Sequence, residues 1–269
     1  MLVTRVITAV IALAIFATAL FLLPQELWAL SLLIVLGIGS WEWAALAGCH
    51  RVARAMYSGL LVLSALALFY VVPRLTSSAQ AVDLVVFIVS GVFWIAVAPF
   101  WLGQRWATRN RFLLGTVGWI ALVPMWLALV RLQPTPWALL LFMSVVWIAD
   151  TAAYVAGKSW GRNKLAPLIS PGKTWEGAFG ALGAVALYYG ALMLLASADE
   201  RYVGGLWGLV LFIAMVVLSI EGDLFESWMK RQAGVKDSGQ ILPGHGGILD
   251  RVDGLTAAMP AAALALYLR

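Results

Sequence analysis

Apolar residues run along this chain in long blocks, each separated from the next by a short polar segment. An α-helix needs about 20 such residues to cross about 30 Å of hydrocarbon. Lipid offers the backbone no hydrogen-bond partners, so the crossing segments must be helical. The pattern predicts an all-α polytopic membrane protein with about nine transmembrane helices. The predicted spans are 5–23, 27–47, 56–72, 82–101, 112–130, 136–157, 175–196, 203–222 and 254–268.

Composition agrees with this pattern. The 269 residues are 63% hydrophobic and 12% charged, and the mean hydropathy of +0.93 lies far outside the range of soluble domains. Eighteen uncharged residues follow Arg5, more than the apolar region of a signal peptide holds, so we expect a retained first span. The single cysteine, Cys49, cannot form a disulfide within the chain.

The basic residues give an orientation. Fourteen of the 18 Lys and Arg residues fall on one side of the nine predicted spans and four on the other. Cytoplasmic loops carry an excess of Lys and Arg, so the N-terminus is predicted to be cytoplasmic. The two long polar loops, 158–174 and 223–253, then share the cytoplasmic face.

Six of the 13 acidic residues lie between Glu221 and Gly254. Asp223 is placed at the inner end of the eighth span, and a helix that continued outward would put Ser227 and Lys230 on the same face. Asp250 and Asp253 open the last helix, where the positive end of the helix dipole favours anions.

A glycine-rich turn, PGHGG, lies between these two helix ends. Its glycines allow backbone N–H groups to approach a ligand closely and form an anion nest. Neighbouring carboxylates can share a hard divalent cation such as Mg²⁺, which also binds phosphate oxygens. Lys230, Arg231, Lys236 and Arg251 could neutralise a polyphosphate. An ordinary solvated loop would explain each residue singly, but their convergence near the lipid boundary favours metal-assisted phosphoryl or nucleotidyl transfer.

The second polar loop contains GKT at 172–174, but position 167, where a phosphate-binding loop needs glycine, holds Pro167. We expect instead a tight turn over 170–174 that leads into the seventh helix, with Ser170 or Thr174 as its cap. Lys173 in that turn could contact a substrate phosphate or only lipid headgroups, and the sequence leaves both open.

Three further polar residues raise the question of a role in the site. Asp150 is the one acidic residue in a long apolar run, where a carboxylate is costly, and we expect it to belong to the site. Glu42, inside the second span, raises the same question with weaker support. His245 has no second histidine nearby, which favours a turn or phosphate-contact residue over a zinc ligand.

The segment SWMKRQAGVKDSGQILPGHGGILDRVD, residues 227–253, resembles the C-terminal signature of the phosphatidate cytidylyltransferases, also called CDP-diacylglycerol synthases. WIADTAAYVAGK, KLAPLISPGKTWEG and GDLFES resemble segments of the same family, as does WEW around Glu42. The resemblance covers nearly the whole chain and is sharpest from Trp147 to the end.

This resemblance implies a multi-pass enzyme of the bacterial inner membrane that condenses CTP with phosphatidic acid to give CDP-diacylglycerol and pyrophosphate. It implies Mg²⁺ as cofactor, suggests a second cation, and points to a homodimer with membrane lipids but no nucleic acid among its partners. The active site would lie at the cytoplasmic face. We expect one continuous membrane domain, with a scaffold and dimer contacts in 1–130 and the catalytic loops in 131–269.

The residues and the resemblance together predict three overlapping sets. The catalytic set is Asp223, Asp250, Lys230, Lys236 and Asp237. The substrate-binding set is Ser170, Lys173, Thr174, Ser227, Arg231, Gly244, His245, Gly246, Gly247, Arg251 and Asp150. The metal ligands are Asp223, Asp250 and Asp253.

Two other classes of membrane protein fit less well. The DGxxAR motif of CDP-alcohol phosphotransferases would need arginine where Ala258 stands, and no acidic residue follows Asp253. A transporter would be expected to show inverted repeats and polar groups near the midplane of the membrane, whereas the acidic residues here gather at one face.

Overall fold

A computed structural model describes residues 13–195, 203–241 and 246–268 of the chain. It has seven helical segments long and apolar enough to cross a membrane, which confirms the predicted all-α polytopic fold. These segments are α2 (Gln25–Leu46), α3 to α4 (Arg51–Leu75), α5 to α6 (Ala79–Gln104), α7 (Arg111–Leu132), α8 (Pro136–Trp160), α9 (Trp175–Leu195) and α10 (Gly205–Gln232). The count of nine and the cytoplasmic N-terminus stay predictions.

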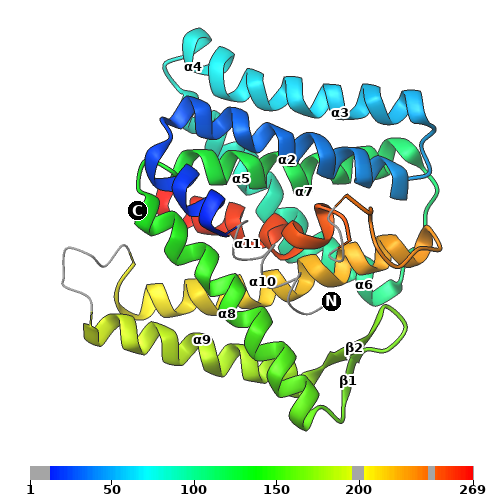
Figure 1. Ribbon diagram of the computed structural model, residues 1–269, viewed down its shortest axis with the longest axis vertical. Coiled ribbons are helices and arrows are strands. Elements are labelled where there is room, and N and C mark those ends of the chain that lie inside the picture. The colour runs from blue at the N-terminus through cyan, green and yellow to red at the C-terminus, as the bar shows by residue number, and fades with distance from the viewer. Residues whose placement is uncertain (1–12, 196–202, 242–245, 269) are drawn as a thin grey trace.

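The first and the last predicted spans are also helical where the structure describes them. The first corresponds to an apolar helix over Leu13–Leu22, and its earlier residues lie outside the described part of the chain. The last corresponds to α11 (Leu249–Tyr267), most of whose residues are buried by neighbouring helices. Helix α11 packs against α10, α7 and α5, so it forms the centre of the bundle (Figure 1).

Two of the spans contain a short π-helical segment. The first comprises α3 (Arg51–Leu66), η1 (Ala67–Val71) and α4 (Val72–Leu75), and the second comprises α5 (Ala79–Val92), η2 (Phe93–Val97) and α6 (Ala98–Gln104). Pro73 and Pro99 stand in the first turn after each π segment. Proline has no N–H and disturbs the hydrogen bonds of the preceding turn, and a local π bulge keeps the helix continuous.

The helices form a layered bundle in which α2 and α3 lie on one side and α8 and α9 on the other (Figure 1). Helices α10 and α11 run between these pairs and contact each other closely. A Cβ atom on Gly222 of α10 would lie 2.5 Å from the carbonyl oxygen of Asp253, so only glycine permits this approach. The contact brings the polar ends of α10 and α11 together.

A small antiparallel hairpin connects α8 to α9. Strands β1 (Lys164–Ala166) and β2 (Ser170–Thr174) pair with Lys164 opposite Thr174. The predicted tight turn over 170–174 was wrong, because these residues are extended and pair with β1, and the turn lies just before them. The predicted cap is confirmed at Thr174, whose Oγ1 accepts a hydrogen bond from the Gly177 N–H at 3.2 Å.

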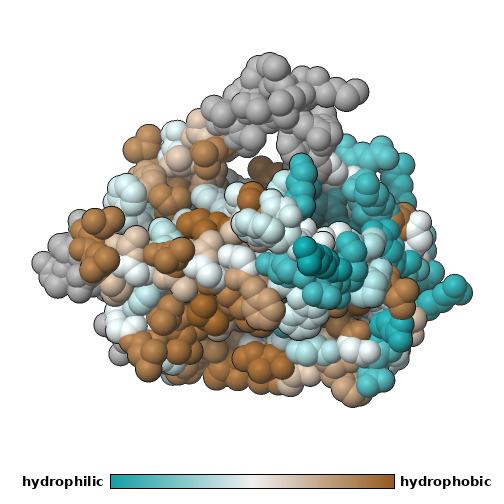
Figure 2. All heavy atoms as spheres, turned by 90° about the horizontal axis from the view of Figure 1, so that it is seen from below, coloured by the Kyte–Doolittle hydropathy of each residue, from teal (hydrophilic) through white to brown (hydrophobic). Residues whose placement is uncertain are grey.

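Figure 2 shows how polarity is distributed on one face of the molecule. Hydrophilic side chains gather toward the end where Figure 1 places the hairpin, and apolar side chains cover much of the rest. The end that carries the hairpin is therefore the more water-compatible end of this face, and much of the rest of the face is compatible with lipid (Figure 2).

Candidate active site

Helix α10 carries the first group of predicted site residues. It has 28 residues and is thus about 42 Å long at about 1.5 Å per residue, more than the hydrocarbon core requires. It continues ten residues beyond the predicted end of the span at residue 222. This continuation is the condition under which Asp223, Ser227 and Lys230 were predicted to share a face. The Ser227 Oγ donates a hydrogen bond to Asp223 at 3.3 Å, so this shared face exists.

A cavity of about 600 Å³ opens at this end of the bundle, between α8, the hairpin, α10, the loop after α10 and the start of α11. Its volume is in the range of small-molecule sites. Every predicted site residue in the described part of the chain lines it, apart from two glycines. Those residues are Asp150, Ser170, Lys173, Thr174, Asp223, Ser227, Lys230, Arg231, Lys236, Asp237, Asp250, Arg251 and Asp253.

The glycine turn is only partly described, because Gly244 and His245 lie outside the described residues. Gly246 has a φ of 81°, the left-handed conformation that glycine adopts without strain. The Gly247 N–H donates to the Asp250 Oδ2 at 2.8 Å. That N–H is therefore already bound by a carboxylate of the protein and is not free for a ligand, which differs from the anion nest expected from the sequence.

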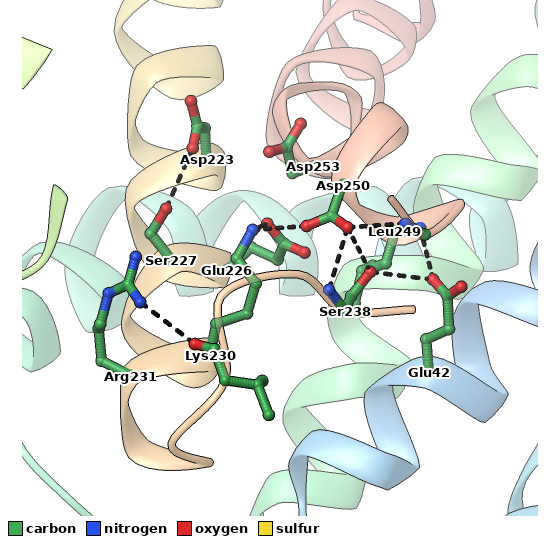
Figure 3. A network of polar contacts seen from close by, with 12 residues as sticks. Glu42, Asp223, Glu226, Ser227, Lys230, Arg231, Ser238, Leu249, Asp250 and Asp253 are labelled. Atoms are coloured by element: carbon green, nitrogen blue, oxygen red, sulfur yellow. Dashed lines mark hydrogen bonds and ion pairs between the residues drawn. The ribbon is translucent and has the colours of Figure 1, made fainter. Parts of the chain in front are cut away.

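Three carboxylates from three helices line the cavity, Asp150 of α8, Asp223 of α10 and Asp253 of α11. Figure 3 shows Asp223 and Asp253 beside each other on neighbouring helices. Asp253 precedes the predicted last span, and its burial, followed by the charge of Asp223, raises its pKa above the usual range. This cluster of like charges would be relieved by a cation, and the Lys173 ammonium already lies 2.8 Å from Asp223.

Asp250 is held by several donors. Its Oδ1 accepts from the Lys230 ammonium at 2.6 Å, and its Oδ2 accepts from the Gly247 N–H at 2.8 Å. The N–H and the hydroxyl of Ser238 donate to the same Oδ2, each at 3.0 Å. Burial alone would raise the pKa of Asp250, but the hydrogen bonds from Lys230 and Gly247 outweigh it and hold the pKa below its usual range.

Lys230 lies between two carboxylates, 2.5 Å from Glu226 and 2.6 Å from Asp250, and is nearly buried. The sequence predicted a lysine that neutralises phosphate, whereas in this conformation the ammonium serves as the counter-ion of two acidic side chains (Figure 3). Glu226 was missed as a member of the site. Its position one helical turn before Lys230 was the signal that could have identified it.

Glu42 comes from the distant helix α2, and its side chain is buried. Its carboxylate accepts hydrogen bonds from the Leu249 N–H at 2.8 Å, the Ile248 N–H at 3.2 Å and the Ser238 hydroxyl at 3.1 Å. The sequence raised the question whether Glu42 has a role in the site. The structure shows that Glu42 binds the loop and the first turn of α11 but does not line the cavity.

The remaining basic side chains of the cavity are more accessible. Arg231, Lys236 and Arg251 are exposed. Arg231 donates to the carbonyl oxygens of Ile169 and Val235, both at 3.2 Å, which holds its guanidinium beside the hairpin. Exposed cations around a cavity that already contains carboxylates suit a ligand that brings both negative charge and a metal ion.

The donor set fits Mg²⁺ in its chemistry. Within the described residues, no three His, Cys, Asp or Glu side chains are arranged as a complete metal site. Mg²⁺ does not need three, because it is commonly bound by one or two carboxylates with phosphate oxygens and waters completing the octahedron. Asp223 and Asp253 supply hard oxygen donors on one wall of the cavity. A metal that arrives with a polyphosphate therefore suits these residues.

Comparison with known proteins gives the same family over nearly the whole chain. Residues 3–269 match the Cytidylyltransferase family. A phosphatidate cytidylyltransferase of Pseudomonas aeruginosa is 39% identical over 99% of this chain and 97% of its own length. The protein of the same name from Haemophilus influenzae is 33% identical over 97% of this chain and 96% of its own length. One from Staphylococcus saprophyticus is 46% identical, over 43% of this chain and 44% of its own length.

Proposed function

The chain belongs to the cytidylyltransferase family, and from this we propose that it condenses CTP with phosphatidic acid to give CDP-diacylglycerol and pyrophosphate. Two relatives that carry the name phosphatidate cytidylyltransferase match it over nearly the full length of both chains. The observation that carries the proposal is the cavity in which Asp150, Asp223 and Asp253 face basic side chains at one end of an apolar bundle.

We place this cavity at the cytoplasmic face of the bacterial inner membrane. The excess of Lys and Arg on the side of the two long polar loops supports that placement. CTP would then reach the cavity from the cytosol, and phosphatidic acid would reach it from the inner leaflet.

The reaction needs no covalent enzyme intermediate. An oxygen of the phosphatidic acid phosphate attacks the α-phosphorus of CTP and forms the new P–O bond. The bond between the α-phosphorus and the oxygen that bridges to the β-phosphorus breaks, and pyrophosphate leaves with that oxygen. The attacking oxygen is already anionic at neutral pH, so the chain needs mainly to position the reactants and to balance charge.

Exposed basic residues are assigned to the phosphates. Arg231, Lys236 and Arg251 border the cavity and can neutralise charge on the triphosphate and on the departing pyrophosphate. Lys173 pairs with Asp223 and can contact a phosphate when a cation takes its place beside the carboxylate. Lys230, which is already bound to two carboxylates, is assigned to holding Asp250 in place.

Mg²⁺ supplies charge neutralisation for phosphate oxygens in transfers of this type. We propose that Asp223 and Asp253 hold it. Asp250 is the third predicted ligand and would have to exchange the Lys230 ammonium for the metal, because both its oxygens accept hydrogen bonds now. A second cation remains part of the proposal without assigned ligands.

The lipid is proposed to enter beside α8 and α9. Tyr154 and Ala178 line the cavity on this side, and Tyr154, Trp175 and Phe179 expose their rings. Aromatic side chains are typical of the membrane interface, where a headgroup would pass. We retain the homodimer as a proposal and place its contacts in the N-terminal half.

The proposal is tested with the purified protein in detergent, supplied with CTP labelled at the α-phosphate, phosphatidic acid and Mg²⁺. We expect the label in a CDP-lipid and an equal amount of pyrophosphate. ATP in place of CTP, and diacylglycerol in place of phosphatidic acid, serve as controls that should give no labelled lipid. Release of pyrophosphate without a labelled lipid would overturn the assignment.

A further inference from the structure

The start of α11 is held by a side chain that does not line the cavity. Glu42 belongs to α2, which contacts the polar end of the molecule from the side opposite the hairpin (Figures 1 and 3). Its three hydrogen bonds reach the N–H groups of Ile248 and Leu249 and the hydroxyl of Ser238. The first N–H groups of a helix have no partner within the helix, so this carboxylate acts as a cap supplied from another helix.

The backbone around Glu42 is shaped to admit its carboxylate. A Cβ atom on Gly239 would overlap the Glu42 Oε1, and one on Gly247 would lie 2.5 Å from the Oε2. Both positions therefore place bare backbone against the same carboxylate. Two glycines from the loop and two amides from the helix start converge on this one side chain.

Ser238 connects Glu42 to the cavity. Its hydroxyl lies 3.1 Å from Glu42 and 3.0 Å from Asp250, and its N–H also donates to Asp250. Asp250 in turn binds Lys230. An unbroken line of contacts thus runs from a membrane helix through Ser238 to a residue of the cavity wall, although Glu42 and Asp250 are far apart in sequence.

We propose that Glu42 is a positioning residue, which sets the place of Asp250 and the glycine turn by capping α11 and holding Ser238 from α2. This inference rests on the proposed function, because the consequence of misplacing Asp250 is read in cytidylyl transfer. Glu42 is not among the residues that line the cavity. It acts through Ser238 and the backbone of the loop.

The test compares Glu42→Gln with Glu26→Gln, a matched change at an exposed position of the same helix. Glutamine has the size of glutamate but offers only one acceptor oxygen to the three donors. Loss of such supporting contacts typically costs 10-fold to 100-fold in activity. We expect kcat of E42Q to fall by about that factor, with KM for phosphatidic acid unchanged and E26Q like the parent protein.

Amide hydrogen exchange gives a readout that does not depend on activity. In E42Q the amides of Ser238, Gly247 and Leu249 should exchange at least tenfold faster, whereas amides in the centre of α7 should not change. General loss of stability would accelerate both groups. If E42Q exchanges and turns over like E26Q in a preparation whose parent protein is active, the inference fails while the proposed function stands.

Two milder variants keep the inference testable if E42Q does not fold. Ser238→Ala removes the hydroxyl between Glu42 and Asp250, and Glu42→Asp keeps the charge while it shortens the reach. We expect each to lower kcat severalfold at unchanged KM for phosphatidic acid. Parent-like kcat in both would overturn the inference, and an inactive parent protein would count against the proposed function instead.

Discussion

The ammonium of Lys173 lies 2.8 Å from the carboxylate of Asp223 and joins the hairpin to helix α10. The same nitrogen donates to the carbonyl oxygen of Ile220 at 3.1 Å. The side chains of Lys173 and Asp223 keep 20% and 37% of their exposure, and pairs this accessible contribute only about 0 to 1 kcal/mol. The pair thus matters little for stability and can exchange partners when a cation and a phosphate arrive.

We therefore expect Lys173→Ala to lower kcat/KM by about 100-fold, or about 2.7 kcal/mol of transition-state stabilisation. The thermal midpoint in detergent should change little. A loss confined to Lys173→Ala would favour a substrate phosphate over general headgroup attraction, the question that the sequence left open, and separate titrations of CTP and phosphatidic acid would show which phosphate Lys173 contacts. Lys164→Ala, at an exposed position of the same hairpin, is the control. Equal losses in both variants would mean that the hairpin attracts only headgroups in general.

The two carboxylates assigned to Mg²⁺ give a second prediction. Asp223→Asn and Asp253→Asn keep the size of the side chain but remove the charge that a hard cation requires. Each variant should lose at least 100-fold in turnover at ordinary Mg²⁺ and regain part of it at high Mg²⁺. The measurement is initial rate against Mg²⁺ concentration. A parental Mg²⁺ dependence in either variant would remove that residue from the metal site.

Lys230 allows a third prediction, on stability. Methionine at this position would leave Glu226 and Asp250 without the ammonium that both contact. Breaking a buried ion pair by removing one partner costs about 3–5 kcal/mol. We expect Lys230→Met to lower the free energy of unfolding by about that amount, measured by denaturant unfolding in mixed micelles.

The double variant Lys230→Met with Glu226→Gln separates stability from activity. Removal of one of the two carboxylates should recover part of the lost free energy of unfolding, because less uncompensated charge remains buried. Activity should stay low, since Asp250 still lacks its partner. Recovery of full activity would show that Lys230 only balances the charge of Glu226.

The sequence predicted most of the fold because a membrane span can be identified from the hydropathy of its own residues. The boundaries of α7 and α8 follow directly from where apolar residues begin and end. Two features depended on pairing and packing, which local hydropathy does not report. The hairpin formed because 170–174 found 164–166 as a partner, and α11 took the centre of the bundle because its small residues fit between α10 and α7.

The sequence predicted which residues belong to the site, but it did not predict which of them form hydrogen bonds and ion pairs with each other. Charge clustering near the lipid boundary identified Asp223, Asp250 and Lys173, and all three line one cavity. The spacing of Glu226 and Lys230 by one helical turn indicated one ion pair of this lysine, but nothing local indicated its second ion pair, with Asp250 of another helix. The capping of α11 by Glu42 could not be foreseen either, because it joins two helices at opposite ends of the chain.

The last prediction concerns an ion pair far from the cavity in sequence and in fold. Asp83 of α5 is buried, and its carboxylate accepts from Arg131 of α7 at 2.7 Å and from the Tyr267 hydroxyl at the end of α11 at 2.9 Å. Neither Asp83 nor its two partners line the cavity of about 600 Å³. These contacts tie the central helix to two neighbours, so they should support the bundle without touching the reaction.

We expect Asp83→Asn to lower the free energy of unfolding by about 3 kcal/mol, because it leaves the Arg131 guanidinium without its counter-ion. The kcat of the folded fraction should stay within about twofold of the parent, because Arg131 and Tyr267 hold α11 at the end opposite Asp250. This is the reverse of the pattern expected for Lys173→Ala, which should lose activity at nearly unchanged stability. The measurement pairs denaturant unfolding with activity per folded molecule. If Asp83→Asn lost activity at unchanged stability, the two ends of α11 would be coupled, and its far end would belong to the catalytic apparatus.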